Sequence, residues 1–470
     1  MANPTLFWPE KPQDIEIHPG HYVIADRIAS GEQEEGDPWR NVLFWGDNKF
    51  VLGSLLMEDW RARLISAGGI KMVYCDPPFG VGTNYNFQHA GVKKIAYRDV
   101  WEKSGNDYLF MLYERFWLIH KLLAEDGNFF LHLNWHNHHY AKILLDEIFG
   151  RENFHNEIIY CFSGGGIPRK ALPRKHDVIL WYSKSKNYTY NPEYHPFTPG
   201  TVDRGRTKVK GKYARLREEG TPLPDWWTDV KKIASPTDHE KLYFDTQKSE
   251  ELIERIIRIG SNEGDLIADF FAGSGTTLAC ALKLGRKWIG CDQEYYAVHL
   301  TRKRLLDIQQ NYNFTVSFDM QYSTDTDRQN NMNLDSNFEN RPEISWEIVP
   351  DGKILRVRLI DYRYKDYESE GEISFSIKNN QLKFAQSEKG ARDISVIVDA
   401  WDKWVDYWAV DDNYSEDRGF FPKIFSYRTQ GNPEINTELV VPKNEQSNQV
   451  FAIKVIDVFG RESIIQAEQY

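Results

Sequence analysis

The sequence predicts an α/β protein built on a mostly parallel sheet. Short apolar runs alternate with amphipathic stretches over residues 41–150 and again over 249–309, which is the pattern of βαβ units. From residue 344 onward the apolar residues alternate without helical spacing, which predicts a small β-rich domain. A chain of 470 residues is long enough for two or three domains.

The individual elements follow in order along the chain. In the first block we expect strands over 41–47, 70–76 and 128–133 and helices over 48–64, 108–123 and 138–149. In the second block we expect helices over 249–259, 276–284 and 294–309 and strands over 266–272 and 287–292. Two strands, 157–162 and 177–183, and a poorly periodic stretch over 184–241 lie between the blocks. In the C-terminal region we expect strands over 354–360, 373–377, 394–398 and 450–455.

The charge of the chain is unevenly distributed. The net charge is −11, from 58 Lys and Arg against 69 Asp and Glu, which over the whole chain argues against a polyanionic partner. Residues 169–217, however, hold 13 basic and three acidic residues, a net charge of +10, whereas residues 331–470 hold 17 and 25, a net charge of −8. A basic segment interleaved with Gly, Pro and Tyr is typical of a phosphate-contacting surface, although a solvated loop would have the same composition.

Composition also excludes several classes of protein. No apolar run reaches the ~18 residues of a membrane span, and the N-terminus lacks the pattern of a secretory signal, so we expect a cytoplasmic protein with no membrane contact. The four cysteines are not spaced as C-x-x-C, which argues against zinc and disulfides. Four histidines cluster at His132, His136, His138 and His139, but a helix entry after a strand accounts for them, and we expect no metal.

The first motif with chemical content is Asp76-Pro77-Pro78-Phe79, which follows a predicted strand. Two prolines fix the backbone, so the Asp76 carboxylate and the Pro77 carbonyl can be held as two acceptors beside the Phe79 ring. This arrangement suits a planar ring with an exocyclic amine, which donates two hydrogen bonds while the ring stacks. A simple strand-ending turn is the alternative interpretation.

The second motif is Asp-Phe-Phe-Ala-Gly-Ser-Gly-Thr-Thr over residues 269–277, between a predicted strand and helix. Its glycines, Gly273 and Gly275, allow a ligand to approach the backbone closely. As a dinucleotide fingerprint the motif is imperfect, because Leu278 stands at the third glycine position. Asp292 ends the next strand, where an acid can accept both ribose hydroxyls; a helix N-cap is the alternative for this residue.

Together these motifs resemble the amino-methylating DNA methyltransferases that use S-adenosyl-L-methionine, in particular the modification subunits of type III restriction systems. The resemblance covers most of residues 41–310, with the Asp-Pro-Pro-Phe motif before the glycine turn, as in the permuted β class. Trp45-Gly46-Asp47-Asn48 is similar to the family's third motif, and Thr246-Gln247-Lys248 to its tenth. Ser249 replaces the proline that follows in the family, with little expected loss because Ser can cap a helix.

The resemblance implies a role for each matched residue. The catalytic residues would be Asp76, Pro77, Pro78 and Phe79. The residues that bind S-adenosyl-L-methionine would be Asp47, Thr246, Gln247, Lys248, Asp269, Phe271, Gly273, Ser274, Gly275, Thr276 and Asp292. The basic middle occupies the place of the target recognition region, so DNA-binding residues would be Arg169, Lys170, Arg174, Lys175, Arg204, Arg206, Lys208, Lys210 and Lys212.

The fold and domain order implied are a Rossmann-like methyltransferase sheet with an inserted target recognition region and a C-terminal β-rich domain. We assign 1–160 and 246–318 to the two halves of the methyltransferase domain, 161–245 to the insertion, 319–343 to a linker and 344–470 to the β-rich domain. The partners implied are double-stranded DNA, a restriction subunit docked on the C-terminal domain, and a second copy in a homodimer. The C-terminal domain could equally be a stabilising appendage.

The expected reaction is methylation of the exocyclic N6 of a flipped adenine within a restriction-modification system. The chain contains no Pro-Cys dipeptide, which C5-cytosine methylation requires in its family. An acid first in the motif favours adenine over cytosine N4, where Ser is common in that position. The alternatives are an N4-cytosine enzyme and a catalytically silent DNA-targeting subunit. A nicotinamide oxidoreductase would leave Asp-Pro-Pro-Phe unexplained, and a protein-glutamine methyltransferase normally opens this motif with Asn.

Overall fold

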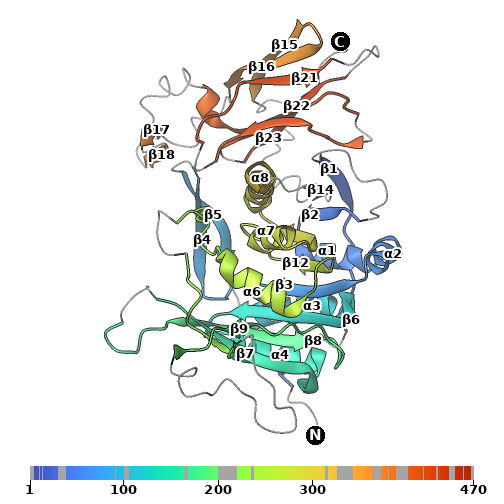
Figure 1. Ribbon diagram of the computed structural model, residues 1–470, viewed down its shortest axis with the longest axis vertical. Helices are drawn as coiled ribbons and strands as arrows, with labels where there is room; N and C mark the ends of the chain where they lie inside the picture. Colours follow the sequence, from blue (N-terminus) through green and yellow to red (C-terminus); the bar gives the residue numbers. More distant parts are fainter. Residues whose placement is uncertain are drawn as a thin grey trace.

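The computed structural model describes most of the chain (Figure 1). It covers residues 5–466 except 10, 13, 30–38, 90–91, 100–104, 164–167, 200–219, 234–237, 313–315, 325–341, 364–371, 379–380, 388–400, 416–417, 430–431, 444–449 and 459. Within this part of the chain, no helix is long and apolar enough to cross a membrane. The strand expected at 394–398 lies outside the described residues.

A large mixed sheet forms the centre of the molecule. Among the described residues its strands pair in the order β1 (Tyr22–Ala29), β14 (Ser317–Ser323), β2 (Asn41–Trp45), β13 (Lys287–Asp292), β12 (Leu266–Asp269), β3 (Ile70–Cys75), β6 (Leu123–Leu133), β8 (His176–Ser183), β7 (Phe154–Cys161) and β11 (Trp226–Trp227). The strands from β14 to β6 are parallel, whereas β1 and β8 run antiparallel to their neighbours. The predicted α/β architecture is therefore confirmed.

Helices cover both faces of the sheet. They are α1 (Asn48–Leu55), α2 (Glu58–Ser66), α3 (Gly105–Leu122), α4 (His138–Phe149), α6 (Glu250–Gly260), α7 (Thr276–Lys283) and α8 (Tyr295–Tyr312). Met72 and Tyr74 pack in one core with α6, whereas Val73 and Cys75 pack in the other core with α3. Successive strand residues point to opposite faces, so a strand covered on both sides is apolar throughout, as in β3.

The edge of the sheet corrects one predicted boundary. The linker was expected from residue 319, but 319–323 belong to β14, which pairs with both β1 and β2. Asp319, at the expected start of the linker, is buried and accepts hydrogen bonds from Arg27 and Arg40, each at 2.8 Å. Residues 325–341 lie outside the described part of the chain.

The middle region contributes to the central sheet as well as to the molecular surface. β8 and β11 lie within residues 161–245, which we assigned to the insertion, yet both belong to the ten-stranded sheet. Two short strands, β9 (Tyr194–His195) and β10 (Thr221–Pro222), pair with each other outside it. The assigned range 161–245 therefore includes two strands of the central sheet. A separate hairpin, β4 (Thr83–His89) and β5 (Val92–Asp99), follows β3.

The C-terminal region is β-rich, as predicted, and has its own apolar core. One sheet contains β15 (Glu343–Asp351), β16 (Ile354–Arg363) and β21 (Glu438–Pro442). A second contains β20 (Ile424–Tyr427), β19 (Val405–Asp411), β22 (Ala452–Asp457) and β23 (Glu462–Gln466), and β17 (Glu372–Lys378) pairs with β18 (Gln381–Ser387). Val357 and Trp408 join the two main sheets in this core.

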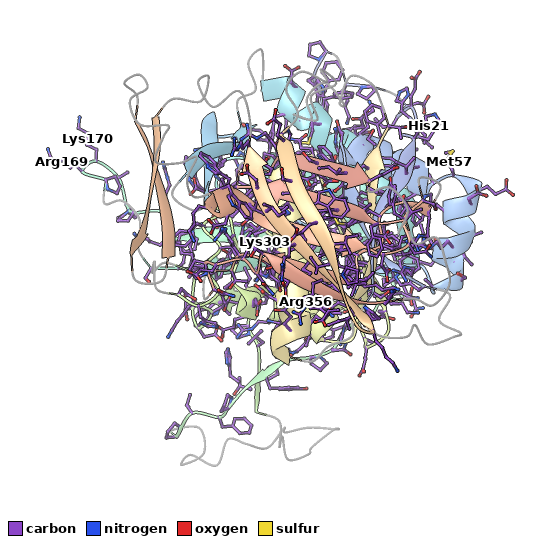
Figure 2. The ribbon with its side chains drawn as sticks, turned by 90° about the horizontal axis from the view of Figure 1, so that it is seen from above. His21, Met57, Arg169, Lys170, Lys303 and Arg356 are labelled. Carbon is purple, nitrogen blue, oxygen red and sulfur yellow. The ribbon has the colours of Figure 1, made fainter. Side chains whose placement is uncertain are left out.

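Buried charges connect the C-terminal region to α8, which lies directly beneath β22 and β23 in Figure 1. Lys303 on α8 contacts Asp406 at 2.8 Å, and Arg302 contacts Asp26 of β1 at 2.5 Å. Lys454 of β22 contacts Glu462 at 2.7 Å. Figure 2 shows Lys303 in the interior of the view, surrounded by other side chains. The C-terminal domain is thus packed on the α/β core through paired charges.

Candidate active site

Four acidic residues mark the site, each at the carboxyl end of a neighbouring parallel strand. Asp47 follows β2, Asp292 ends β13, Asp269 ends β12 and Asp76 follows β3. Because these ends meet at one edge of the sheet, all four acids line one cavity of about 440 Å³. The size is that of a small-molecule site.

The loop after β3 is held rigidly by side chains from other elements. The Pro78 carbonyl accepts a hydrogen bond from the Tyr108 hydroxyl at 2.8 Å, and the Phe79 carbonyl accepts one from the Asn137 amide at 2.7 Å. The two backbone amides that follow Phe79 donate to the Asp99 carboxylate at 2.9 and 3.0 Å. Asp76 and Pro78 line the cavity directly, and Phe79 packs behind them.

The Asp76 carboxylate has one engaged and one unengaged oxygen. Its Oδ2 contacts the ammonium of Lys248, which also lies 5.4 Å from the centroid of the Phe79 ring. Its Oδ1 is buried and has no hydrogen-bond partner among the described residues. A buried carboxylate oxygen without a donor is costly, so this atom is suited to a donor supplied by a ligand.

Three polar side chains, Tyr74, His132 and Asp177, lie next to one another beneath this loop. The Tyr74 hydroxyl is 2.8 Å from His132 Nδ1, and His132 Nε2 is 3.5 Å from Asp177 Oδ2. The His132 ring is stacked on Phe79, with centroids 6.3 Å apart and 29° between planes. His132 therefore supports the Phe79 ring. Within the described residues, no group of three or more His, Cys, Asp or Glu is placed to hold a metal ion.

The glycine turn has two glycines with different tasks. Gly273 (φ +52°) lines the cavity, and its amide donates to Asp292 Oδ2 at 2.8 Å. Gly275 (φ +73°) does not line the cavity; a Cβ there would lie 2.5 Å from the Thr301 hydroxyl on α8. The cofactor role expected for Gly275 stays a prediction; what the structure shows is close packing between the turn and α8 at this residue.

Gln247, another residue expected to bind the cofactor, makes side-chain hydrogen bonds to backbone groups of the protein. Its side chain is buried, accepts a hydrogen bond from the Leu242 amide at 2.7 Å and donates to the Glu240 carbonyl at 2.5 Å. These bonds brace the segment before α6 and leave Gln247 outside the cavity lining. The remaining residues expected to bind the cofactor do line the cavity: Asp47, Thr246, Lys248, Asp269, Phe271, Gly273, Ser274, Thr276 and Asp292.

Buried carboxyl groups dominate the cavity wall formed by the ends of β12 and β13. Burial raises the pKa of Asp269 to about 7 and that of Asp292 to about 6. Asp292 Oδ1 accepts from the Glu294 amide at 2.9 Å, so the predicted helix-cap contact and the position in the cavity coexist in one residue. Burial, followed by the nearby Asp292 carboxylate, raises the pKa of Glu294 to about 7.

Several lining residues were missed by sequence reasoning. Glu294 lines the cavity, as do four residues of α3: Asp107, Phe110, Met111 and Arg115. Arg115 donates to Asp47 Oδ1 and to Asn48 Oδ1, each at 3.0 Å, and so connects α3 to the loop after β2. No motif marks the four α3 residues, because along the sequence they occupy ordinary positions of an amphipathic helix.

The expected DNA-binding residues are partly described. Arg169, Lys170, Arg174 and Lys175 lie on the connection between β7 and β8, and Figure 2 shows Arg169 and Lys170 projecting away from the body of the molecule. The Arg174 guanidinium stacks on the Trp135 ring at 3.5 Å. Arg204, Arg206, Lys208, Lys210 and Lys212 lie outside the described residues.

Part of the chain is similar to known DNA methyltransferases. Residues 70–303 match the family described as DNA methylase, a span that contains both the Asp-Pro-Pro-Phe loop and the glycine turn. The type II methyltransferase M.EcaI of Enterobacter cloacae is 27% identical over 325 residues, 56% of this chain and 69% of that protein. The Mod subunit of the type III enzyme EcoP15I of Escherichia coli is 24% identical over 188 residues, 36% of this chain and 28% of the subunit. The solved M1.HpyAVI–SAM complex is 21% identical and covers 56% of this chain and 98% of its own, with a TM-score of 0.36.

Proposed function

Residues 70–303 belong to the DNA methylase family, and we propose that this protein transfers a methyl group from S-adenosyl-L-methionine to the exocyclic N6 of adenine at a specific DNA site. The observation that carries the proposal is the buried, unengaged Asp76 Oδ1 beside a cavity whose other wall is the glycine turn. One side of the site offers acceptors to an amine, and the other offers backbone and carboxylates to a nucleoside.

The Asp-Pro-Pro-Phe loop would orient the target amine. The Asp76 carboxylate and the Pro77 carbonyl each accept one N–H, which directs the nitrogen lone pair out of the ring plane toward the methyl group. The Phe79 ring provides the stacking surface for a base that has left the duplex. As the nitrogen attacks, it gains positive charge before it releases a proton, and the fixed Asp76 carboxylate stabilises that charge. The rigid bracing of this loop means that little reorganisation is needed.

The residues of the cavity fit S-adenosyl-L-methionine, which supplies an electrophilic methyl group on a sulfonium. Asp292 lies at the end of β13, the position from which an acid binds ribose hydroxyls in nucleotide-binding folds. The positive φ of Gly273 places its backbone on the cavity wall without a side chain. Thr246 and Lys248 line the same cavity from the segment before α6. The buried acids on this wall suit a ligand that carries hydroxyls and a positive charge.

The identity of the methylated base is a separate part of the proposal. Adenine is supported by Asp76 as the first residue of the motif, and cytosine N4 is the alternative. Single-molecule sequencing of DNA from cells that express the protein reports the modified base and the recognised sequence together. We expect modified adenine at one short sequence; modified cytosine would overturn the assignment.

The catalytic role of Asp76 can be tested by removing its carboxylate. We expect Asp76→Ala to lower methyl transfer by about 10³-fold, because the acceptor for the amine is lost. Transfer of a labelled methyl group to DNA measures the rate, and isothermal titration measures cofactor affinity, which should not change. Asp126→Ala is the control, since Asp126 pairs with Lys71 outside the cavity lining. An equal loss of cofactor affinity in Asp76→Ala would contradict the division of roles.

A restriction-modification context is supported by the names of the relatives, which include a type III Mod subunit. We propose a restriction subunit as a partner of the C-terminal domain, and co-purification of the expressed pair would test it. The homodimer and the cytoplasmic location stay predictions.

A further inference from the structure

We propose that Leu172, on the basic connection between β7 and β8, inserts into the DNA base stack next to the flipped base and keeps the duplex open. The inference rests on the proposed DNA methyltransferase function and names the residue that would replace the base in the stack. Leu172 is 88% exposed, more than any other large apolar side chain among the described residues. A single exposed leucine is ordinary by itself, so its surroundings decide its interpretation.

The surroundings of Leu172 are those of a DNA-contacting loop. The sequence over residues 168–175 is Pro-Arg-Lys-Ala-Leu-Pro-Arg-Lys, with four cations and no acid. Arg169 and Lys170 extend away from the body of the molecule (Figure 2). Cations on both sides of an apolar side chain can hold phosphates while that side chain enters a base step, which is how Leu, Ile, Met and Pro wedges act in known complexes. Pro173 stiffens the backbone directly after Leu172.

The connection is fixed to the catalytic loop through a short series of contacts. The Arg174 guanidinium stacks on Trp135 at 3.5 Å, and Asn137, two residues after Trp135, donates to the Phe79 carbonyl at 2.7 Å. Leu172 is two residues from Arg174, so their Cα atoms are at most ~7 Å apart. The proposed wedge and the proposed stacking surface for the flipped base are therefore held by the same assembly.

The base of the connection is also anchored. The Phe162 amide donates to the Lys175 carbonyl at 2.9 Å, and β8 begins at the next residue, His176. Lys232 lies 4.5 Å from the Phe162 ring. The hydrogen bond between Phe162 and Lys175 and the stacking of Arg174 on Trp135 hold the backbone near Leu172, whose side chain stays exposed. A support of this kind can press an apolar group against DNA without first having to order the loop.

The test uses the full-length protein and two duplexes of the recognised sequence, once sequencing has identified the methylated position. One duplex carries 2-aminopurine at that position and reports base flipping by fluorescence, and the other is unmodified and reports the methylation rate. We expect Leu172→Ala to reduce the fluorescence increase on binding and to lower the single-turnover methylation rate by roughly 10-fold. The reason is that no side chain then occupies the space that the flipped base leaves in the stack. Leu172→Met should retain most of the rate, since Met is also a known wedge.

Two controls separate this role from a structural one. Ile65→Ala removes an apolar side chain that is 69% exposed on α2, and Figure 2 places Met57, immediately before α2, on the opposite side of the molecule from Lys170. It should not change the rate. A substrate with a mismatch at the target base pair is already partly open, so it should restore the rate of Leu172→Ala.

The outcomes are distinct. If wild-type protein methylates the duplex and Leu172→Ala matches it, or if the mismatch restores nothing, the wedge is wrong and the proposed function stands. If wild-type protein transfers no methyl group to any DNA, the proposed function itself is wrong.

Discussion

The basic connection between β7 and β8 and the acidic C-terminal domain carry opposite charge, and they use it in opposite ways. On the connection, Arg169 and Lys170 project outward (Figure 2). In the C-terminal domain several acids are buried and paired within the molecule, among them Asp406, Asp411, Asp457 and Glu462. The difference teaches that the net charge of a segment indicates a partner only where the charges reach the surface unpaired.

This comparison changes how the C-terminal domain is understood. Part of its negative charge neutralises cations of α8 and of its own strands, as in the contact between Lys303 and Asp406. The same α8 begins directly after Glu294, which lines the cavity. The hydroxyl of Tyr295, the first residue of α8, donates to Glu462 of β23. The domain thus supports the wall of the cavity that contains Glu294, while the connection, which we propose contacts DNA, extends toward solvent.

The largest expected effect comes from removing a buried charge of the C-terminal domain. Asp406→Ala should lower the free energy of unfolding by about 3–5 kcal/mol, because it leaves Lys303 and His299 buried without their shared carboxylate. Chemical denaturation measures the change. Asp402→Ala, at a more exposed ion pair with Lys403, is the control and should change stability by less than about 1 kcal/mol. Equal losses of stability in both variants would mean that burial does not make the Lys303–Asp406 pair more important than an exposed pair.

Two glycine substitutions in the glycine turn test whether its glycines serve packing or the approach of a ligand. Gly275→Ala should destabilise the protein by about 3 kcal/mol, since a methyl group would meet Thr301 and the backbone has positive φ. Gly273→Ala should destabilise it by about 1 kcal/mol, because its neighbour, Phe244, is 3.4 Å from the added atom and only the backbone strain remains. Thermal unfolding compares the two. The reverse order would refute the separation of packing and ligand approach in this turn.

The exposed half of the comparison is tested by Arg169→Ala combined with Lys170→Ala. We expect weaker DNA binding and a salt dependence reduced by about one phosphate contact per residue, with stability changed by less than about 0.5 kcal/mol. Fluorescence anisotropy across a range of salt concentrations measures the slope. Arg356→Ala, in the C-terminal domain (Figure 2), is the matched control and should leave the slope unchanged. If Arg356→Ala reduced the salt dependence and the Arg169 and Lys170 substitutions did not, the C-terminal domain and not the connection would contact DNA.

The last prediction concerns the dependence of stability on pH. Glu294 has a pKa of about 7 because it is buried, whereas an unfolded Glu titrates near about 4.3. Between about pH 4 and 7 the folded protein keeps a proton that the unfolded chain has lost, so stability falls as pH rises through this range. Glu294→Gln should remove part of this slope and stabilise the protein at pH 8 by about 2 kcal/mol. Denaturation at pH 5 and 8 tests this, with exposed Glu16→Gln as control; identical slopes would contradict it.

Much of the fold and of the site could be predicted from local sequence. The strand before Asp76, the glycine turn and the strand that ends at Asp292 are each encoded by a short local segment, and each lies within the alternating pattern of βαβ units. The two motifs lie at the same edge of the sheet because parallel strands align their carboxyl ends. The sequence by itself therefore determined the α/β class, the order of the motifs and the four acids of the cavity.

The remaining features depend on contacts between distant residues. Only the tertiary structure decided that Lys248 contacts Asp76, that Gly275 packs against Thr301 and that β14 belongs to the central sheet. It also decided that Asp406 is paired with a lysine more than a hundred residues away in the chain. Charge and polarity are written in the sequence, but whether a charged group is buried, paired or free to meet DNA depends on which surfaces the fold brings together, because burial is a property of the packed chain.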